Sequence, residues 1–243
     1  MEIYKMNKPN NYKSAWEESY ARGENNILYP QAEVIRFLNR YVCKQNSDRS
    51  ADQIIKTSKN RPLKGLDFAC GVGTHGIAFA DFGIEPYGVD ISKTAISYAK
   101  NNAFEKGVSA EHFIVLNSSQ QALPFKDNFF DFVLAESCLD SMPLSIAKNY
   151  VSEIKRVCNG LVYASLIGKS DDMNADEFLV STIHEKGTYQ TVFDENKISS
   201  LFGIKLENFR HLSLINQVDI ETKKLTGKRY YCVIDSELIN IKQ

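Results

Sequence analysis

The residues best placed to do chemistry form a glycine-rich turn after a short apolar run. The turn contains Gly71, Gly73 and Gly76, and the run before it covers residues 65–69. Because glycine has no Cβ, such a turn lets the backbone approach a ligand closely and leaves the first N–H groups of the next helix free. Asp90 ends the following apolar run, where a carboxylate can accept hydrogen bonds from both hydroxyl groups of a ribose. This spacing predicts a nucleotide-like cofactor at the carboxyl ends of parallel strands.

Strand-like and helix-like runs alternate from residue 63 onward, which predicts a parallel sheet that positions this turn. The expected strands cover residues 65–69, 86–90, 112–116, 129–135 and 161–166, and the expected helices cover residues 74–82, 92–107 and 143–157. After residue 168 the pattern changes to one helix near residues 175–184 and another capped by Asp194. Two β-rich runs, residues 209–218 and 229–234, close the chain; their short link predicts antiparallel pairing.

We therefore predict an α/β fold with a doubly wound, seven-stranded, mostly parallel sheet and a C-terminal antiparallel hairpin. Helices cover both faces, and a helix over residues 14–21 and another that begins at Pro30 form an N-terminal helical cap. The whole chain, residues 1–243, is expected to be one domain. Its parts are the cap and a polar connector (1–62), the core (63–167), an insertion and helix (168–205), and the hairpin (206–243).

The composition argues against several other classes of protein. The formal net charge of −1 gives the chain no bias toward nucleic acid or an anionic membrane, and a basic cluster over residues 223–229 is typical of a solvated turn. No apolar run approaches the ~18 residues that suggest a membrane span, and the polar N-terminus lacks the apolar stretch of a signal peptide. The five cysteines are scattered without CxxC spacing, so we expect reduced thiols, a cytoplasmic location and no metal site.

The glycine turn by itself fits two kinds of cofactor. Its three glycines satisfy the GxGxxG pattern of dinucleotide-binding folds, which keeps an NAD enzyme as an alternative. Asp67 favours another cofactor, because a dinucleotide fold usually has only apolar residues inside its first strand. The segments Leu123-Pro-Phe125 and Phe130-Asp131 before and within the fourth strand favour it as well. So does the expected C-terminal hairpin, which takes the place of a second mononucleotide-binding half.

With these features the chain resembles the class I S-adenosylmethionine-dependent methyltransferases. The matching segments follow the family's order and usual spacing: Leu66–Gly73 (LDFACGVG), Tyr87–Ser92 (YGVDIS), Leu123–Phe125 (LPF), Phe130–Val133 (FDFV) and Glu153–Val157 (EIKRV). The similarity covers roughly residues 64–166. It implies S-adenosylmethionine as the cofactor and S-adenosylhomocysteine as its product.

The resemblance also implies which residues bind this cofactor. Asp67 and the backbone from Ala69 through Gly71 to Gly73 would line the methionine portion. Asp90 would bind the ribose diol, and Ile91 would pack on the adenine ring.

Three further contacts are implied in the same way. Glu136, after the fourth strand, would reach the cofactor. Where the family usually places an Asp for the adenine amino group, this chain has Asn117, Ser118 and Ser119, any of which can supply an oxygen. In related enzymes an N-terminal segment lies over the cofactor, so Tyr20 or Arg22 would meet the methionine carboxylate; the alternative is a packed Tyr and a surface Arg.

Methyl transfer from a sulfonium depends mainly on positioning, because the leaving group is a neutral thioether; an oxygen acceptor also needs a general base. Asp140, in the loop after the fourth strand, is one candidate, and capping the next helix is its alternative role. His184, in the insertion, is the other, against a helix cap or an exposed side chain.

The N-terminal helices and the insertion over residues 168–190 are expected to build the acceptor pocket. Because both are small, we predict a small-molecule acceptor, methylated at oxygen by in-line displacement, and a monomer or homodimer with no membrane partner. The alternatives are an RNA or protein methyltransferase and a cofactor-binding protein without methyltransferase activity.

Overall fold

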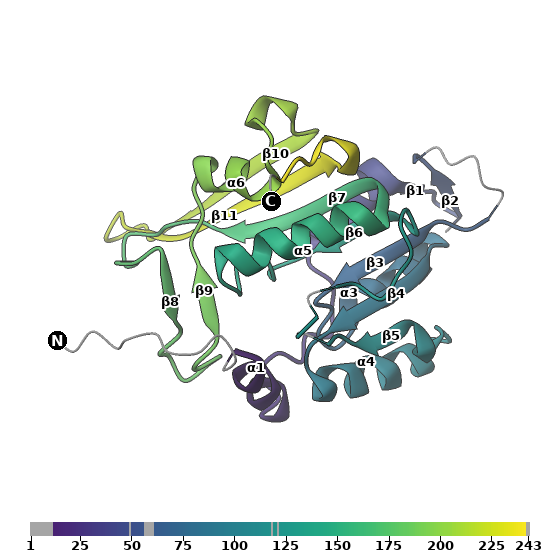
Figure 1. Ribbon diagram of the computed structural model, residues 1–243, viewed down its shortest axis with the longest axis horizontal. Helices are drawn as coiled ribbons and strands as arrows, with labels where there is room; N and C mark the ends of the chain where they lie inside the picture. Colours follow the sequence, from purple (N-terminus) through teal and green to yellow (C-terminus); the bar gives the residue numbers. More distant parts are fainter. Residues whose placement is uncertain (1–11, 49, 56–60, 118, 121, 242–243) are drawn as a thin grey trace.

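A seven-stranded sheet forms the centre of the protein (Figure 1). A computed structural model describes residues 12–241 except 49, 56–60, 118 and 121. The strands of this sheet are β3 (Lys64–Phe68), β4 (Glu85–Asp90), β5 (Phe113–Val115), β6 (Phe130–Ala135), β7 (Cys158–Ile167), β10 (His211–Val218) and β11 (Leu225–Asp235). Their order is β10-β11-β7-β6-β3-β4-β5. Strands β3 to β7 are parallel, whereas β11 is antiparallel to both β7 and β10. The predicted parallel sheet with a terminal hairpin is confirmed.

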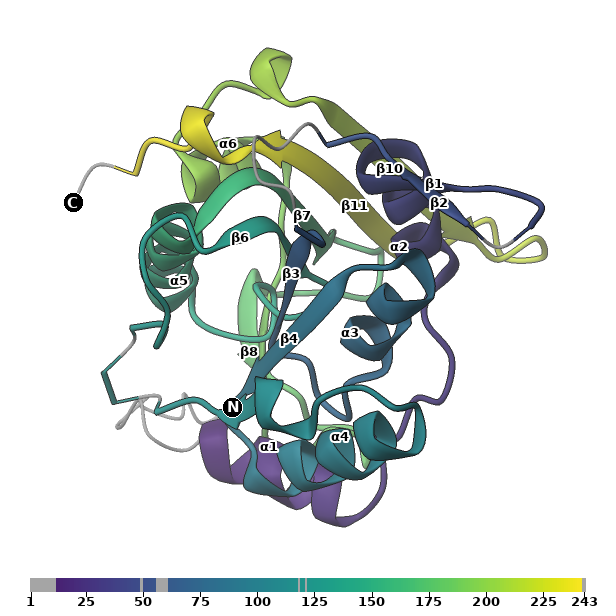
Figure 2. The same cartoon turned by 90° about the vertical axis from the view of Figure 1, so that its right-hand side faces the viewer.

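Helices cover both faces of this sheet (Figure 2). Their bounds are α1 (Tyr12–Ala21), α2 (Ala32–Phe37), α3 (Thr74–Ala78), α4 (Lys93–Glu105), α5 (Leu144–Val157) and α6 (Glu195–Phe202). A π-helical turn (Leu38–Val42) extends α2, and a 3₁₀ turn (Phe79–Phe82) extends α3. Helices α5 and α6 lie on one face, and α2 and α3 lie on the other. Helix α5 packs on the sheet through an apolar stripe at helical spacing: Ala147, Tyr150, Val151, Ile154 and Val157.

Strand β6 shows how the sheet separates two apolar cores. All six of its residues are buried, as expected for a central parallel strand. Val133 and Ala135 belong to the core beneath α5, whereas Phe132 and Leu134 belong to the core beneath α2. This alternation follows from the two-residue period of a strand, and it holds the carboxyl end of β6 rigidly beside β3.

The predicted helix caps at Ser92 and Asp194 are confirmed. The Ser92 hydroxyl accepts a hydrogen bond from the Ala95 N–H at 3.0 Å, and the Asp194 carboxylate accepts one from the Lys197 N–H at 2.8 Å. Both bonds satisfy N–H groups that a helix start leaves without an intrahelical partner. The Ser92 cap places the first turn of α4 directly after Asp90, at the edge of the crevice.

One prediction about local structure is wrong. Residues 175–184 do not form a helix: β8 (Glu177–Leu179) pairs antiparallel with β9 (Tyr189–Thr191). The apolar residues Phe178, Leu179 and Ile183 have helical spacing, but hydrogen bonds between the two strands satisfy the backbone of this segment instead. Within the polar connector, β1 (Cys43–Gln45) pairs antiparallel with β2 (Ala51–Gln53).

Within the described part of the chain, no helix has the length and apolar character needed to cross a membrane. The same residues contain no group of three His, Cys, Asp or Glu side chains arranged to hold a metal ion. All five cysteines are buried free thiols.

Candidate cofactor and acceptor site

Two adjoining cavities lie at the carboxyl ends of β3, β4 and β6. The smaller one, about 620 Å³, is mainly apolar, and its lining includes Phe68, Val89, Ile91, Leu116, Met142 and Tyr150. The larger one, about 930 Å³, is polar, and its lining includes His75, Glu136, Asp140, Glu185, Gln190 and Arg229. Trp16, Tyr20, Ala69, Ser137 and Ser141 line both cavities. The two cavities therefore form one crevice with an apolar end and a polar end.

The glycine turn forms the wall between β3 and α3. Gly71 and Gly73 have φ angles of 54° and 83°, in the left-handed region that favours glycine. A Cβ on Gly71 would lie only 2.5 Å from the Tyr20 hydroxyl oxygen. The Gly71 N–H donates to the Asp90 carboxylate at 2.9 Å. At Gly71 the crevice is therefore lined by backbone without a side chain. The hydrogen bond to Asp90 also connects the turn after β3 to the end of β4.

Asp90 lies at the end of β4 with both carboxylate oxygens oriented by backbone. One oxygen accepts from the Gly71 N–H, and the other accepts from the Ser92 N–H at 2.8 Å. Burial raises the Asp90 pKa to about 6, although these N–H donors lower it. Each oxygen keeps a further lone pair, so the carboxylate can still accept hydrogen bonds from two ligand hydroxyl groups.

Asp67 lies inside β3, and it is the acid that set the predicted first strand apart from the apolar first strand of a dinucleotide-binding fold. Its carboxylate accepts from the Gly76 N–H at 2.8 Å, so it orients the first turn of α3 from inside the core. Burial, together with the negative charges of Asp90 and Glu136, raises its pKa to about 8, although the Gly76 N–H lowers it. Three acidic groups therefore lie near one another at this edge of the sheet.

Helix α1 lies over the crevice as the predicted cap. Trp16 and Tyr20, one helical turn apart, line both cavities. Glu17, on the same helix, accepts hydrogen bonds from the Ser92 hydroxyl at 2.7 Å and from the Thr94 hydroxyl at 2.6 Å. Figure 1 shows the β8–β9 hairpin reaching the same helix. The cap is therefore attached to the core on the side where α4 begins.

Some expected residues do not reach the crevice in this structure. The Arg22 side chain is 43% exposed and donates to Glu24 at 2.7 Å, because this neighbouring carboxylate binds its guanidinium. The His184 side chain is 61% exposed, and it is Glu185 that lines the larger cavity. Neither Arg22 nor His184 is therefore placed for the role that the sequence suggested.

In the segment expected to contact adenine, Asn117 and Ser119 likewise line neither cavity. The Asn117 side chain is exposed, and its oxygen accepts from the Ser119 N–H and hydroxyl, which forms a local turn. Ser118 lies outside the described residues. Leu116, one residue earlier, lines the apolar cavity.

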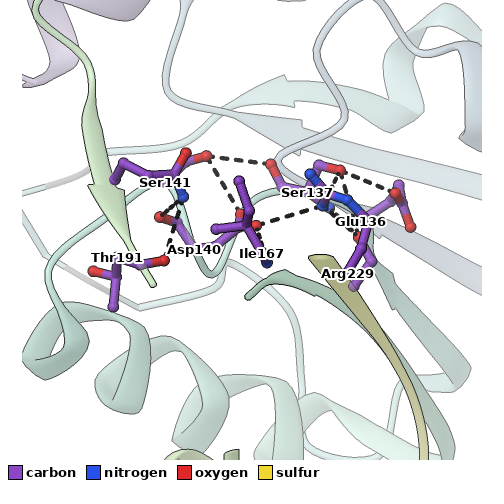
Figure 3. Close-up of polar contacts among 9 residues, drawn as sticks. Glu136, Ser137, Asp140, Ser141, Ile167, Thr191 and Arg229 are labelled. Atoms are coloured by element: carbon purple, nitrogen blue, oxygen red, sulfur yellow. Dashed lines mark hydrogen bonds and ion pairs between the residues drawn. The ribbon is translucent and has the colours of Figure 1, made fainter. Parts of the chain in front are cut away.

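Asp140 connects the loop after β6 to three strands (Figure 3). Its carboxylate accepts from the Ile167 N–H at 2.8 Å and lies 3.5 Å from the Arg229 guanidinium. Its carbonyl oxygen accepts from the Thr191 N–H at 2.7 Å. Burial raises the Asp140 pKa, and the Arg229 charge lowers it. Asp140 does not cap α5, because the N-cap position is Pro143.

Arg229 and Ser137 are site residues that the sequence analysis missed. The Arg229 guanidinium donates to the Ser137 hydroxyl at 3.0 Å and to the Ser165 hydroxyl at 3.4 Å. Arg229 had been assigned to a solvated turn, yet it pairs with Ile167 across β11 and β7. The sequence did contain a signal for this role, because Arg229 is the first residue of a predicted strand and that strand had to pair with a neighbour in the sheet.

Comparison with known proteins agrees with this geometry. Residues 66–162 match a family described as "Methyltransferase domain". A putative methyltransferase of Bacillus subtilis is 34% identical over 94 residues, which are 38% of this chain and 36% of that protein. The core of this chain is therefore similar to a methyltransferase domain, and its fold is that of the class I S-adenosylmethionine-dependent methyltransferases. The chain matches about two fifths of the length of its curated relatives.

Solved structures of methyltransferases have the same fold as this protein. A methyltransferase from Methanosarcina mazei has a TM-score of 0.59 at 20% identity, over 73% of this chain and 93% of that one. The 1,6-didemethyltoxoflavin-N1-methyltransferase of Burkholderia thailandensis has a TM-score of 0.64 at 16% identity, over 96% of this chain and 92% of that one. At these identities the likeness concerns the fold alone.

The crevice of the methyltransferase domain fits S-adenosylmethionine. The apolar cavity beside Ile91 suits an adenine ring, and the Asp90 carboxylate suits a ribose diol. The bare backbone at Gly71 leaves room for close approach. Glu136, in the lining of the polar cavity, is an acidic group that suits a ligand with a sulfonium and an ammonium.

Proposed function

We propose that this protein is an enzyme that transfers a methyl group from S-adenosylmethionine to a hydroxyl group of a small molecule. The observation that supports it most directly is Asp90, held by two backbone N–H groups beside the glycine turn of a methyltransferase domain. When bound, S-adenosylmethionine supplies an electrophilic methyl group on a sulfonium. The rest of the chemistry is positioning by the protein, which favours in-line displacement.

Each part of the crevice has a role in this proposal. Asp90 holds the ribose and Ile91 packs on the adenine. Asp67 and the backbone at Ala69, Gly71 and Gly73 line the methionine portion, together with the backbone of Glu136. Tyr20 covers them from α1, because its hydroxyl lies against Gly71.

The polar cavity is the proposed acceptor pocket, and α1 and the β8–β9 hairpin contribute to its walls. One structural neighbour is described with both 1,6-didemethyltoxoflavin and S-adenosylhomocysteine bound, which supports a small-molecule acceptor. Asp140 lies in this pocket, and His184 does not. We therefore keep Asp140 as the acid that organises the pocket, and we do not assign the base to His184.

Two features of the proposal concern the whole protein. Five free, buried cysteines fit the cytoplasmic location predicted from the sequence. A monomer or a homodimer fits the proposal equally well, since the described residues of one chain form the whole crevice.

Calorimetry tests the cofactor. We expect S-adenosylhomocysteine to bind in the micromolar range and NAD not to bind. Binding of NAD without S-adenosylhomocysteine would overturn the proposal. An activity screen with methyl-labelled S-adenosylmethionine over metabolite classes, RNA and protein then tests the acceptor: label in RNA or protein alone would contradict a small-molecule acceptor.

A further inference from the structure

His75 is held in one tautomer by a backbone contact. It stands in the first turn of α3, directly after the glycine turn, and it lines the polar cavity. The Gln31 N–H, just before α2, donates to its Nε2 at 3.3 Å. A backbone N–H can only donate, so Nε2 acts as an acceptor here and the neutral ring carries its proton on Nδ1.

The Nδ1–H of His75 is a donor that the protein itself does not use. The contact with Gln31 is the one side-chain hydrogen bond that His75 makes among the described residues. Nδ1 is also not one of the fully enclosed unpartnered atoms of these residues, so it is accessible from the cavity that His75 lines. A donor that the backbone holds in one tautomer is preorganised for an acceptor group of a ligand.

The surroundings of His75 suit a negatively charged acceptor. Burial lowers the His75 pKa to about 4, and no carboxylate of the described residues raises it. A carboxylate within ~4–6 Å would stabilise the charged ring and raise this pKa. The acids that line the polar cavity, Glu136, Asp140 and Glu185, therefore stand away from this part of its wall.

Arg22 and Arg229 already have acidic partners. Arg22, which the sequence analysis expected to meet the methionine carboxylate, donates to Glu24 at 2.7 Å. Arg229 is the one Lys or Arg among the described residues that line the crevice, and its guanidinium lies 3.5 Å from the Asp140 carboxylate. A ligand carboxylate beside Arg229 would meet the negative charge of Asp140, whereas one beside His75 would not.

The place of His75 along the cavity wall agrees with the proposed course of the cofactor. In the proposed function Asp90 holds the ribose, and the backbone at Gly71 lines the methionine portion. Gly71, Val72, Thr74 and His75 all line the polar cavity. The glycine turn and the first turn of α3 therefore form one continuous wall that leads from the methionine portion to His75.

We propose that the His75 Nδ1–H donates a hydrogen bond to the carboxylate in the methionine portion of S-adenosylmethionine. This inference rests on the proposed function. S-Adenosylhomocysteine keeps this carboxylate, so the same hydrogen bond holds the product. His75 is thus a binding residue without a part in proton transfer, and Gln31 sets the tautomer that the contact requires.

Substitutions of His75 separate this hydrogen bond from the contact with Gln31. His75→Asn keeps a donor at the same number of bonds from Cα as Nδ1, but it has no atom in place of Nε2. His75→Gln has an oxygen in place of Nε2, which keeps the contact with Gln31, and it lacks the donor at Nδ1.

Calorimetry with S-adenosylhomocysteine compares these variants. We expect His75→Gln and His75→Ala to bind it about tenfold or more weakly, because a hydrogen bond to a charged group is lost. His75→Asn should stay within about threefold of the unaltered protein. His184→Ala, exposed and outside both cavities, is the matched control and should bind as the unaltered protein does.

Two further ligands show whether the carboxylate is the group that His75 binds. 5′-Methylthioadenosine lacks the amino acid portion, and decarboxylated S-adenosylhomocysteine lacks only the carboxylate. We expect His75→Gln to bind both as the unaltered protein does. Losses in His75→Gln that are equal for all three ligands, full affinity of His75→Gln for S-adenosylhomocysteine, or a loss in His75→Asn as large as that in His75→Gln would each overturn the proposal. Failure of the unaltered protein to bind S-adenosylhomocysteine would instead overturn the proposed function.

Discussion

At the scale of single residues, Asp90 is the acid that we propose to bind the cofactor ribose. Two backbone N–H groups fix its carboxylate, so its free lone pairs are oriented before any ligand arrives. Preorganisation of this kind increases affinity, because the side chain loses little freedom on binding. We expect Asp90→Ala to weaken S-adenosylhomocysteine binding about 100-fold, since hydrogen bonds to a charged group contribute ~1.5–3 kcal/mol each. Calorimetry measures this directly.

Asp81→Ala is the matched control for this prediction, because Asp81 is an exposed acid in the turn after α3. It should bind S-adenosylhomocysteine as the unaltered protein does. If Asp90→Ala kept full affinity with an intact fold by circular dichroism, the ribose would lie elsewhere in the crevice.

At the scale of elements, hydrogen bonds connect α1, which covers the crevice, to the start of α4. Glu17 on α1 accepts hydrogen bonds from the Ser92 hydroxyl and from the hydroxyl and N–H of Thr94. These donors stand in the first turn of α4, where the helix dipole favours a negative charge. Ser92 also donates its N–H to Asp90, so the cap and the proposed ribose site share one residue.

We expect Glu17→Gln to accelerate dissociation of S-adenosylhomocysteine about tenfold, because an amide loses the charge that strengthens these hydrogen bonds. Trp16, the chain's single tryptophan, lies next to Glu17 and lines the crevice, so its fluorescence reports the dissociation in a stopped-flow experiment. Glu18→Gln, on the exposed side of the same helix, should leave the rate unchanged. Equal rates in all three proteins would show that the contact does not hold the cap.

At the scale of the whole molecule, the buried acids predict that stability falls as pH rises above neutrality. The folded pKa of Asp67 is about 8, well above its ordinary value of 3.8. Between these values the folded state binds more protons than the unfolded chain, so the free energy of unfolding decreases with pH. His75 has the opposite sign, but its folded pKa of about 4 and ordinary value of 6.5 confine its effect to lower pH.

Thermal unfolding without ligand, from about pH 6.5 to about pH 8.5, tests this prediction. We expect the midpoint to fall by roughly 2–4 °C or more, the shift that ~1 kcal/mol produces in a chain of this size. Asp67→Asn should flatten the dependence, since its amide oxygen can still accept from the Gly76 N–H. A steep dependence that persists in Asp67→Asn would assign the effect to other acids.

The sequence by itself determined the core of the fold and the cofactor. The positions of the glycine turn and of Asp90 follow local rules of turns and strand ends, so spacing predicted them, whereas the role of Asp67 was implied by the family resemblance. The caps at Ser92 and Asp194 were visible for the same reason, because a cap bonds only to residues two or three positions away.

Only the tertiary structure decided how the polar cavity is built. Glu136, Ser137, Asp140 and Arg229 meet because β11 enters the sheet antiparallel beside β7, a pairing between segments far apart in the chain. Arg22 and His184 had suitable chemistry, but a nearby carboxylate held the first and a turn exposed the second. A binding site formed by one strand and the turn after it can be predicted from the sequence. A pocket formed by several distant segments depends on how those segments pack.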